Sequence, residues 1–139
     1  MRFSGKIFKD GKFWLAEIPI LDLMTQGLTK KEAFEMVADM LETMVNKEGF
    51  KVRVYKGKNN SFEIGFSEAK YMIGFLLQRK REMSGLSVSQ LTESLGMSSH
   101  DSYSIYEQGK SVPSLEKLNA FFHAVSHGSD IVISESTIF

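Results

Sequence analysis

The first part of the chain alternates apolar and polar residues with a period of two, which is typical of strands with one buried face. Phe3, Gly5 and Ile7 share one side of the first predicted strand, and Asp10-Gly11 is a strong signal for a two-residue hairpin turn. The second strand should end at Pro19, because proline cannot donate to a ladder of hydrogen bonds.

One helix and three more short strands complete this half. A third strand is predicted over residues 22–26. Thr29 and Glu32 form a T-x-x-E capping box, after which apolar residues recur at helical spacing as far as a stop near Gly49. Two further strands are predicted over residues 50–56 and 61–66. The order β-β-β-α-β-β predicts a small antiparallel sheet with the helix on one face.

From about residue 68 the apolar period becomes helical and stays so. Four helices are predicted, over residues 68–84, 88–95, 99–108 and 114–126. The last segment is β-branched and alternating, which predicts a strand. We expect this strand to pair with its copy in a second subunit, the alternative being a strand folded back on its own domain. The fold class is therefore α+β, in three parts: residues 1–67, 68–128 and 129–139.

Composition narrows the class of protein. The 139 residues carry 17 Lys+Arg against 17 Asp+Glu, which excludes a uniformly basic nucleic-acid coat, although not a local basic face. The absence of cysteine excludes disulfides, thiolate zinc sites and cysteine nucleophiles. No apolar run resembles a signal peptide or a membrane span, so we expect a soluble, cytoplasmic protein without a membrane partner.

No group of residues in the first half suggests catalysis. Residues 1–69 contain no histidine, and their carboxylates fit turn, cap and solvated positions. His123 and His127 have the i, i+4 spacing of metal ligands, but an exposed pair near a helix C-terminus explains them better. We therefore expect no catalytic residue, no metal and no cofactor.

Two groups of side chains in the first half allow more than one interpretation. The first is predicted to be adaptable core packing, although methionine is also common at partner surfaces; it comprises Met36, Met40 and Met44. The second is basic and would suit either RNA binding or a solvated face; it comprises Lys51, Arg53, Lys56 and Lys58.

The second half resembles the phage-repressor-like (Xre-type) helix-turn-helix. The residues that carry this resemblance are Leu86-Ser87, Leu91, Leu95-Gly96, Ile105, Glu107-Gln108-Gly109-Lys110 and Pro113-Ser114-Leu115. In that family, the helix after the tight turn enters the major groove of DNA. The resemblance also implies a structural ion pair between Arg81 and Glu107.

The same resemblance implies a set of DNA contacts. The residues expected to face the bases are Ser99, His100, Ser102 and Tyr103. Asp101 would accept a hydrogen bond from cytosine or cap the helix, and Lys110 and the amides near Ser87 would contact phosphates. Residues 70–128 hold six basic and five acidic side chains, so one copy should bind DNA weakly. We therefore expect a homodimer or a higher oligomer.

Nearly the whole chain resembles the HicB antitoxins. The residues that carry this resemblance are Phe13-Trp14, Glu17-Ile18-Pro19, Thr25-Gln26-Gly27-Leu28-Thr29 and Glu32-Ala33, together with the downstream motif over 103–110. The family implies a truncated ribonuclease-H-like sheet that binds a HicA-like toxin, which is an mRNA-cleaving ribonuclease. It also implies a helix-turn-helix that represses the shared operon. The residues then expected near the toxin are Trp14, Thr25, Gln26 and Gly27.

The sequence thus predicts an antitoxin and repressor that is not an enzyme. The main alternative is a solitary helix-turn-helix regulator whose N-terminal domain senses a ligand or a partner. A nuclease is a further alternative, because the ribonuclease-H-like fold hosts nucleases. It would need clustered acidic metal ligands inside the sheet, and no strand offers a convincing pair around Glu17 or Asp22.

Overall fold

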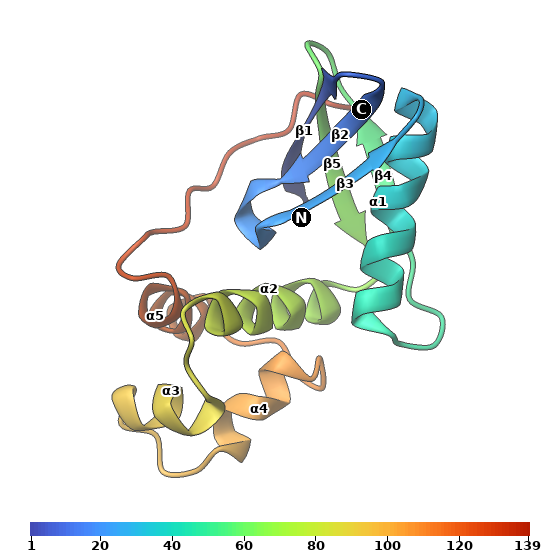
Figure 1. The fold of residues 1–139 in the computed structure, drawn as a ribbon. Coiled ribbons are helices and arrows are strands. Elements are labelled where there is room, and N and C mark those ends of the chain that lie inside the picture. Colours follow the sequence, from blue (N-terminus) through green and yellow to red (C-terminus); the bar gives the residue numbers. More distant parts are fainter. The chain divides into compact units, whose positions relative to one another are not determined.

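The computed structural model describes all 139 residues, and the chain divides into two compact units. Unit 1 comprises residues 1–68 and 135–139, and unit 2 comprises residues 69–134 (Figure 1). The fold is mixed α+β, with a five-stranded antiparallel sheet and five α-helices. None of these helices combines the length and the apolar character that a membrane span requires.

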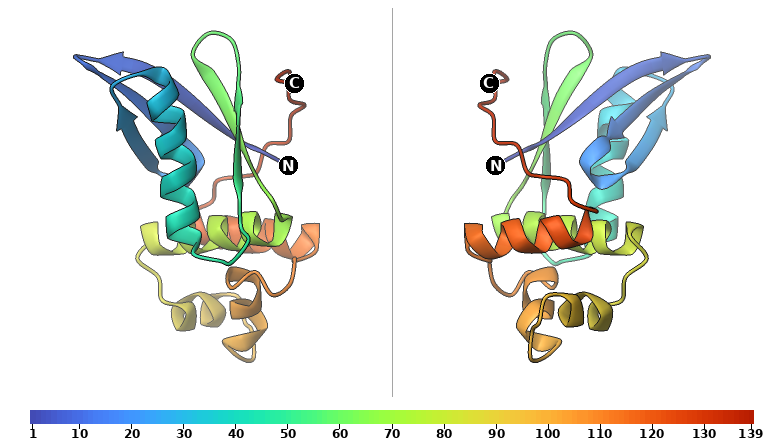
Figure 2. Two further views of the ribbon diagram at one scale, coloured as in Figure 1. Left: turned by 90° about the vertical axis from the view of Figure 1, so that its right-hand side faces the viewer. Right: turned by 90° about the vertical axis from the view of Figure 1, so that its left-hand side faces the viewer.

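Unit 1 is built on a sheet with the strand order β3-β2-β1-β5-β4. The strands are β1 (Phe3–Asp10), β2 (Phe13–Ile18), β3 (Leu23–Gly27), β4 (Val52–Lys56) and β5 (Ser61–Phe66). Ile7 lies opposite Ala16 and Phe3 lies opposite Ile64, so the apolar residues of neighbouring strands share one face. Helix α1 (Lys30–Val45) runs along the sheet (Figure 2), and its buried Val37 and Leu41 form the core with this face.

Helix α1 begins as the capping box predicts. Thr29 Oγ1 accepts a hydrogen bond from the backbone N–H of Glu32 at 3.1 Å. The helix ends at Val45, before the predicted stop at Gly49, because Asn46 adopts a left-handed conformation with φ of 49°. Asparagine tolerates this conformation better than most residues, so it can end a helix in the way that glycine does.

The methionines of α1 are less buried than predicted. Met36 is 39% exposed and Met44 is 42% exposed, whereas Met40 is half-buried. The prediction that all three pack in the core is therefore wrong for Met36 and Met44. The apolar stripe is broader than the sheet face, so Ala33 and Leu41 fill the contact and the methionines at its borders face solvent.

Unit 2 contains helices α2 (Ala69–Met83), α3 (Val88–Ser94), α4 (Asp101–Glu107) and α5 (Leu115–Val125). All four helices contribute to one apolar core. Its buried residues are Ile73, Leu77, Leu91, Tyr103, Tyr106, Phe121 and Val125. The chain reverses after α2, α3 and α4 at the glycines that the sequence marks as stops, since each has a positive φ.

Residues 129–139 form no strand within the chain, so the alternative of a strand folded back on its own domain is wrong, whereas pairing with a second subunit stays a prediction. A β-branched, alternating segment favours an extended backbone, but a strand forms only when another strand satisfies its hydrogen bonds. The end of the chain instead contacts side chains of unit 1. Arg2 Nη1 donates to the backbone oxygen of Ile138 at 2.7 Å, and Ser136 Oγ donates to Glu63. Residues 135–139 therefore belong to unit 1 without joining its sheet.

Close packing at Gly5 provides a test of the sheet. A Cβ atom at this position would lie 2.2 Å from Cζ of the buried Phe62. We expect Gly5→Ala to lower the free energy of unfolding by about 1–3 kcal/mol, because the ring has to move within a filled core. Urea denaturation followed by the fluorescence of Trp14, the single tryptophan, would measure this in unit 1.

Ser4→Ala is the matched control, because Ser4 is the exposed neighbour on the other face of β1. This control should change the free energy of unfolding by less than about 0.5 kcal/mol. Equal urea midpoints for Gly5→Ala and Ser4→Ala would contradict the close packing of Phe62 against Gly5.

Candidate nucleic-acid interface

The region predicted to bind DNA consists of α3, a tight turn and α4. Ser87 caps α3 with a full capping box, because its Oγ accepts from the Gln90 N–H and its own N–H donates to Gln90 Oε1. Gly96 follows α3 with φ of 67°, a conformation that costs glycine little. The buried Leu91 holds α3 in the core of unit 2. Local sequence thus determines both ends of α3.

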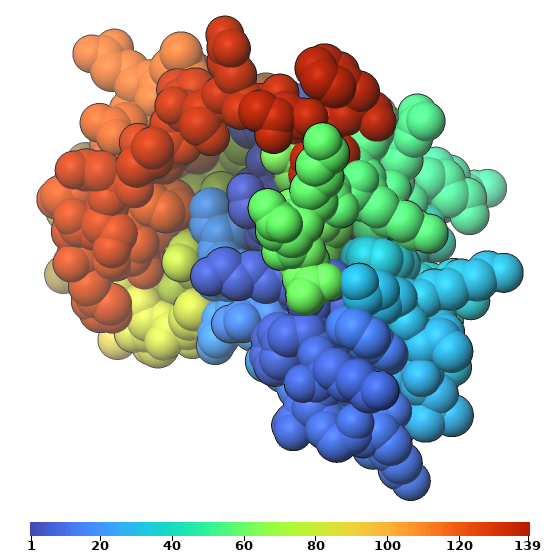
Figure 3. Space-filling model, turned by 90° about the horizontal axis from the view of Figure 1, so that it is seen from above, coloured from blue at the N-terminus to red at the C-terminus, as the bar shows by residue number.

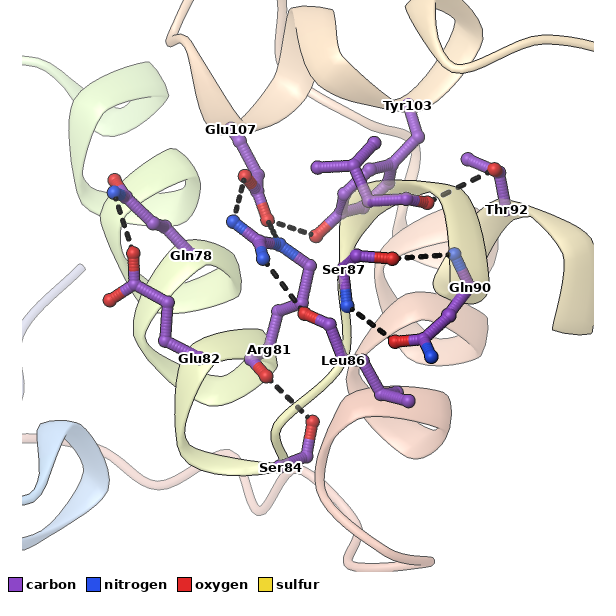
Figure 4. Close-up of polar contacts among 11 residues, drawn as sticks. Gln78, Arg81, Glu82, Ser84, Leu86, Ser87, Gln90, Thr92, Tyr103 and Glu107 are labelled. Atoms are coloured by element: carbon purple, nitrogen blue, oxygen red, sulfur yellow. Dashed lines mark hydrogen bonds and ion pairs between the residues drawn. The ribbon is translucent and has the colours of Figure 1, made fainter.

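The ion pair that the sequence predicts between Arg81 and Glu107 is present in unit 2 (Figure 4). Arg81 Nε lies 2.6 Å from Glu107 Oε1, and Arg81 Nη2 lies 3.2 Å from Glu107 Oε2. Arg81 Nη1 also donates to the backbone oxygen of Leu86 at 2.8 Å. The two charged side chains are only 14% and 10% exposed. One guanidinium group therefore connects α2, the segment before α3, and α4.

Tyr103 belongs to this network, and the prediction that its side chain contacts DNA is wrong. Its side chain is fully buried, its hydroxyl donates to Glu107 Oε1 at 2.8 Å, and its ring packs edge-on against Phe121. Burial is the main cause that raises the pKa of Tyr103 far above its ordinary value, and the nearby Glu107 carboxylate raises it further. The hydrogen bond to Glu107 likewise raises the pKa of Arg81, although its own burial opposes this. Tyr103 shares the apolar face of α4 with Tyr106, and a buried carboxylate satisfies its polar end.

The other predicted DNA contacts are accessible. Ser99, His100, Lys110 and Ser87 are exposed, and Ser102 is half-buried. Ser102 donates its N–H to Ser99 Oγ at 3.4 Å and its hydroxyl to the Ser99 backbone oxygen at 2.6 Å. Ser99 therefore makes the capping contact expected of Asp101, which is instead the first residue of α4.

Two residues that the sequence analysis did not single out help to place this surface. A Cβ atom on Gly74 of α2 would lie 2.6 Å from the backbone oxygen of Tyr106, so α2 and α4 cross in close backbone contact. The sequence signal for this crossing is a glycine inside a helical pattern, which often marks a close packing contact. Thr92 is buried, and its hydroxyl is satisfied within α3 by the backbone oxygen of Val88 at 3.0 Å.

The four residues predicted to contact a toxin do not share one face of unit 1. Trp14 pairs with Gly27 and Ala16 with Thr25, so Trp14, Thr25 and Gly27 lie on the side of the sheet that α1 covers. Gln26 lies on the opposite face and is exposed. Gly27 is buried, and a Cβ atom there would lie 2.5 Å from the backbone nitrogen of Ala33 in α1. Its role is therefore to allow close packing of β3 against the start of α1.

The start of α4 offers exposed hydroxyl and imidazole groups on a helix that buried contacts hold in place. Such groups can hydrogen-bond to base edges and phosphates. No protein-family model matches the chain, and no curated protein matches it either.

The dependence of the free energy of unfolding on pH above about 10 tests the contact between Tyr103 and Glu107. The pKa of Tyr103 is raised above 10.0, so above about pH 10 the unfolded chain loses this proton while the folded chain keeps it. The stabilisation by the neutral hydroxyl is therefore complete below about pH 10 and decreases as the pH rises further. We expect Tyr103→Phe to lower the free energy of unfolding by about 1–2 kcal/mol near pH 8. Its loss of stability between about pH 9 and 11 should be smaller than in the wild type.

Urea denaturation at a series of pH values would measure both effects. Tyr106→Phe is the control for removing a hydroxyl from α4, because the Tyr106 hydroxyl contacts Lys117 and not Glu107. Parallel pH profiles for the wild type and Tyr103→Phe would contradict the raised pKa.

Proposed function

We propose that the chain is a cytoplasmic antitoxin of the HicB type. Unit 2 would bind the operator of its own operon as a helix-turn-helix, and unit 1 would bind and occlude a HicA-like mRNA-cleaving toxin. The observation that carries the proposal is the largely buried pair of Arg81 and Glu107, which ties α2 to the end of α4, while His100 and Asp101 at the start of α4 are exposed. A recognition helix needs this arrangement, because its first residues face the groove while its other face packs in the core.

The proposed base contacts come from the start of α4 and the residues before it. Ser99, His100 and Ser102 are the candidates there, and Lys110 is the candidate for a phosphate contact. Unit 2 is nearly neutral, so the electrostatic attraction that one copy gains is small. Two copies on adjacent half-sites would double the contacts, which is why the proposal includes a homodimer on a palindromic operator.

Replacing His100 and Lys110 distinguishes base reading from phosphate contact. We expect His100→Ala to weaken operator binding about tenfold and binding to unrelated duplex DNA far less. Lys110→Gln should weaken both about equally and reduce the slope of log affinity against log salt. Fluorescence anisotropy with labelled DNA from upstream of the coding sequence would measure these affinities.

The matched control is His123→Ala, which removes an imidazole that is exposed on α5. Operator binding that His100→Ala and His123→Ala change equally would contradict the assigned surface. The full chain is used throughout, so that the oligomeric state is the same in every titration.

The proposed binding site for the toxin is the edge of the sheet formed by β3. β3 is the first strand in the sheet order, so one side of its backbone has no neighbouring strand. Met24 in β3 and Leu28 directly after it are 49% and 58% exposed. An open strand edge accepts a strand of a partner through main-chain hydrogen bonds, and exposed apolar side chains add contact area. No catalytic group is needed for such binding.

Co-expression with the neighbouring open reading frame tests the antitoxin proposal. We expect that frame to stop growth when expressed alone and the wild-type chain to restore growth. Met24→Glu combined with Leu28→Glu should restore growth at least tenfold less well, because two charges would be placed at the proposed interface. Viable counts on inducing plates would measure the rescue.

Met44→Glu is the matched control, because Met44 is a methionine of similar exposure, 42%, near the end of α1. Full restoration of growth by the Met24/Leu28 variant would show that β3 is not part of the toxin interface. If the neighbouring reading frame does not stop growth and the chain still binds its operator, the antitoxin proposal is wrong and the chain is a solitary transcription regulator.

A further inference from the structure

Lysine side chains gather at one end of unit 1. The β1–β2 turn, the start of α1 and the β4–β5 turn lie at this end (Figure 3), where Lys30 Nζ donates to Asn60 Oδ1 at 2.9 Å. Residues 9–12, 29–32 and 56–60 hold six lysines against two carboxylates. The lysines are Lys9, Lys12, Lys30, Lys31, Lys56 and Lys58. No ion pair joins any of them to a carboxylate. This lysine end therefore carries a net charge of +4 over these residues.

An aromatic ring lies within the lysine end. The Nζ atoms of Lys30 and Lys9 lie 4.8 and 6.0 Å from the centroid of the Trp14 ring, and this side chain is only partly buried. Lys56 Nζ lies 5.2 Å from the centroid of the Phe34 ring on the same side of the sheet. Ammonium groups over aromatic faces are attracted to the ring and stay available to an anion.

The structure regroups the basic residues that the sequence analysis considered for RNA binding. Lys51 lies 4.0 Å from Glu42, and Arg53 packs over the Tyr55 ring on the other face of β4. Only Lys56 and Lys58 of that set belong to the lysine end. The basic strand is therefore not one surface, and a different set of lysines surrounds Trp14.

The chemistry of the lysine end matches a single-stranded nucleic acid better than a protein. Lysine is depleted in protein–protein interfaces, whose centres need desolvated apolar area. Single strands are bound by cationic side chains that follow the phosphates and by aromatic rings on which bases stack. We propose that the lysine end of unit 1 binds single-stranded RNA. Trp14 stacks on a base, and Lys9, Lys30 and Lys56 neutralise neighbouring phosphates.

The single tryptophan makes the proposal directly measurable, because Trp14 is the only indole in the chain. Titration of the full chain with an oligouridylate of about 12 nucleotides should quench this fluorescence. The affinity should fall at least about tenfold between roughly 50 and 200 mM salt. Lys9→Gln combined with Lys30→Gln should weaken binding about tenfold or more. Lys47→Gln, a change in an exposed lysine near the other end of α1, should have little effect.

Three results would overturn the proposal. One is the absence of quenching at low salt. Another is equal affinity for an aspartate-rich peptide of the same length, which would make the lysine end a site for acidic proteins. The third is RNA binding that Lys110→Gln in unit 2 weakens as much as the Lys9/Lys30 variant does, which would place the RNA on unit 2. Operator and toxin binding are measured separately, so failure of those proposals leaves this result interpretable.

Discussion

The largely buried pair of Arg81 and Glu107 is the interaction on which the arrangement of unit 2 depends. Taking two charges out of water costs several kcal/mol, and the cost is offset only when geometry and further hydrogen bonds satisfy both groups. Here the guanidinium makes a bidentate contact and a third bond to the Leu86 carbonyl, while the Tyr103 hydroxyl donates to the carboxylate. No buried side-chain nitrogen or oxygen is left without a partner. Helices α3 and α4 have seven residues each, too few to be stable alone, so these contacts and the core hold α4 in place and determine which face it exposes.

The neutral charge of the chain is the sum of unequal surfaces. Unit 2 gathers its most buried charges into one internal pair and exposes mainly hydroxyl and imidazole groups at the start of α4. Unit 1 places six of its nine lysines at one end of the sheet, whereas Glu63 and Glu42 lie elsewhere and have basic partners. Electrostatic attraction acts over about a Debye length, roughly 8 Å at physiological salt, so a ligand responds to the local group and not to the total. A balanced composition is therefore compatible with two different anionic ligands.

Local signals in the sequence predicted most of the fold. Alternation located the strands, Asp10-Gly11 located the first hairpin, and Thr29 located the start of α1, because each depends on residues that are close in sequence. The ion pair followed from a resemblance that combines residues 26 positions apart. The errors came from partners that no local pattern contains. Tyr103 has a polar end that suggests solvent, but its position on the α4 helix turns it toward Glu107. The last residues alternate like a strand, but strand formation needs a partner edge, and sequence alone does not show which edge is free.

The docking of the last residues on unit 1 makes unit 2 an insertion between two segments of unit 1. Ser136 and Ile138 follow unit 2 in the chain, so they reach Arg2 and Glu63 only after residues 69–134 have been synthesised. The strands and α1 have by then emerged from the ribosome and can fold first, as N-terminal segments generally do. The nascent protein therefore carries Arg2 and Glu63 uncovered by the tail while unit 2 is still being translated.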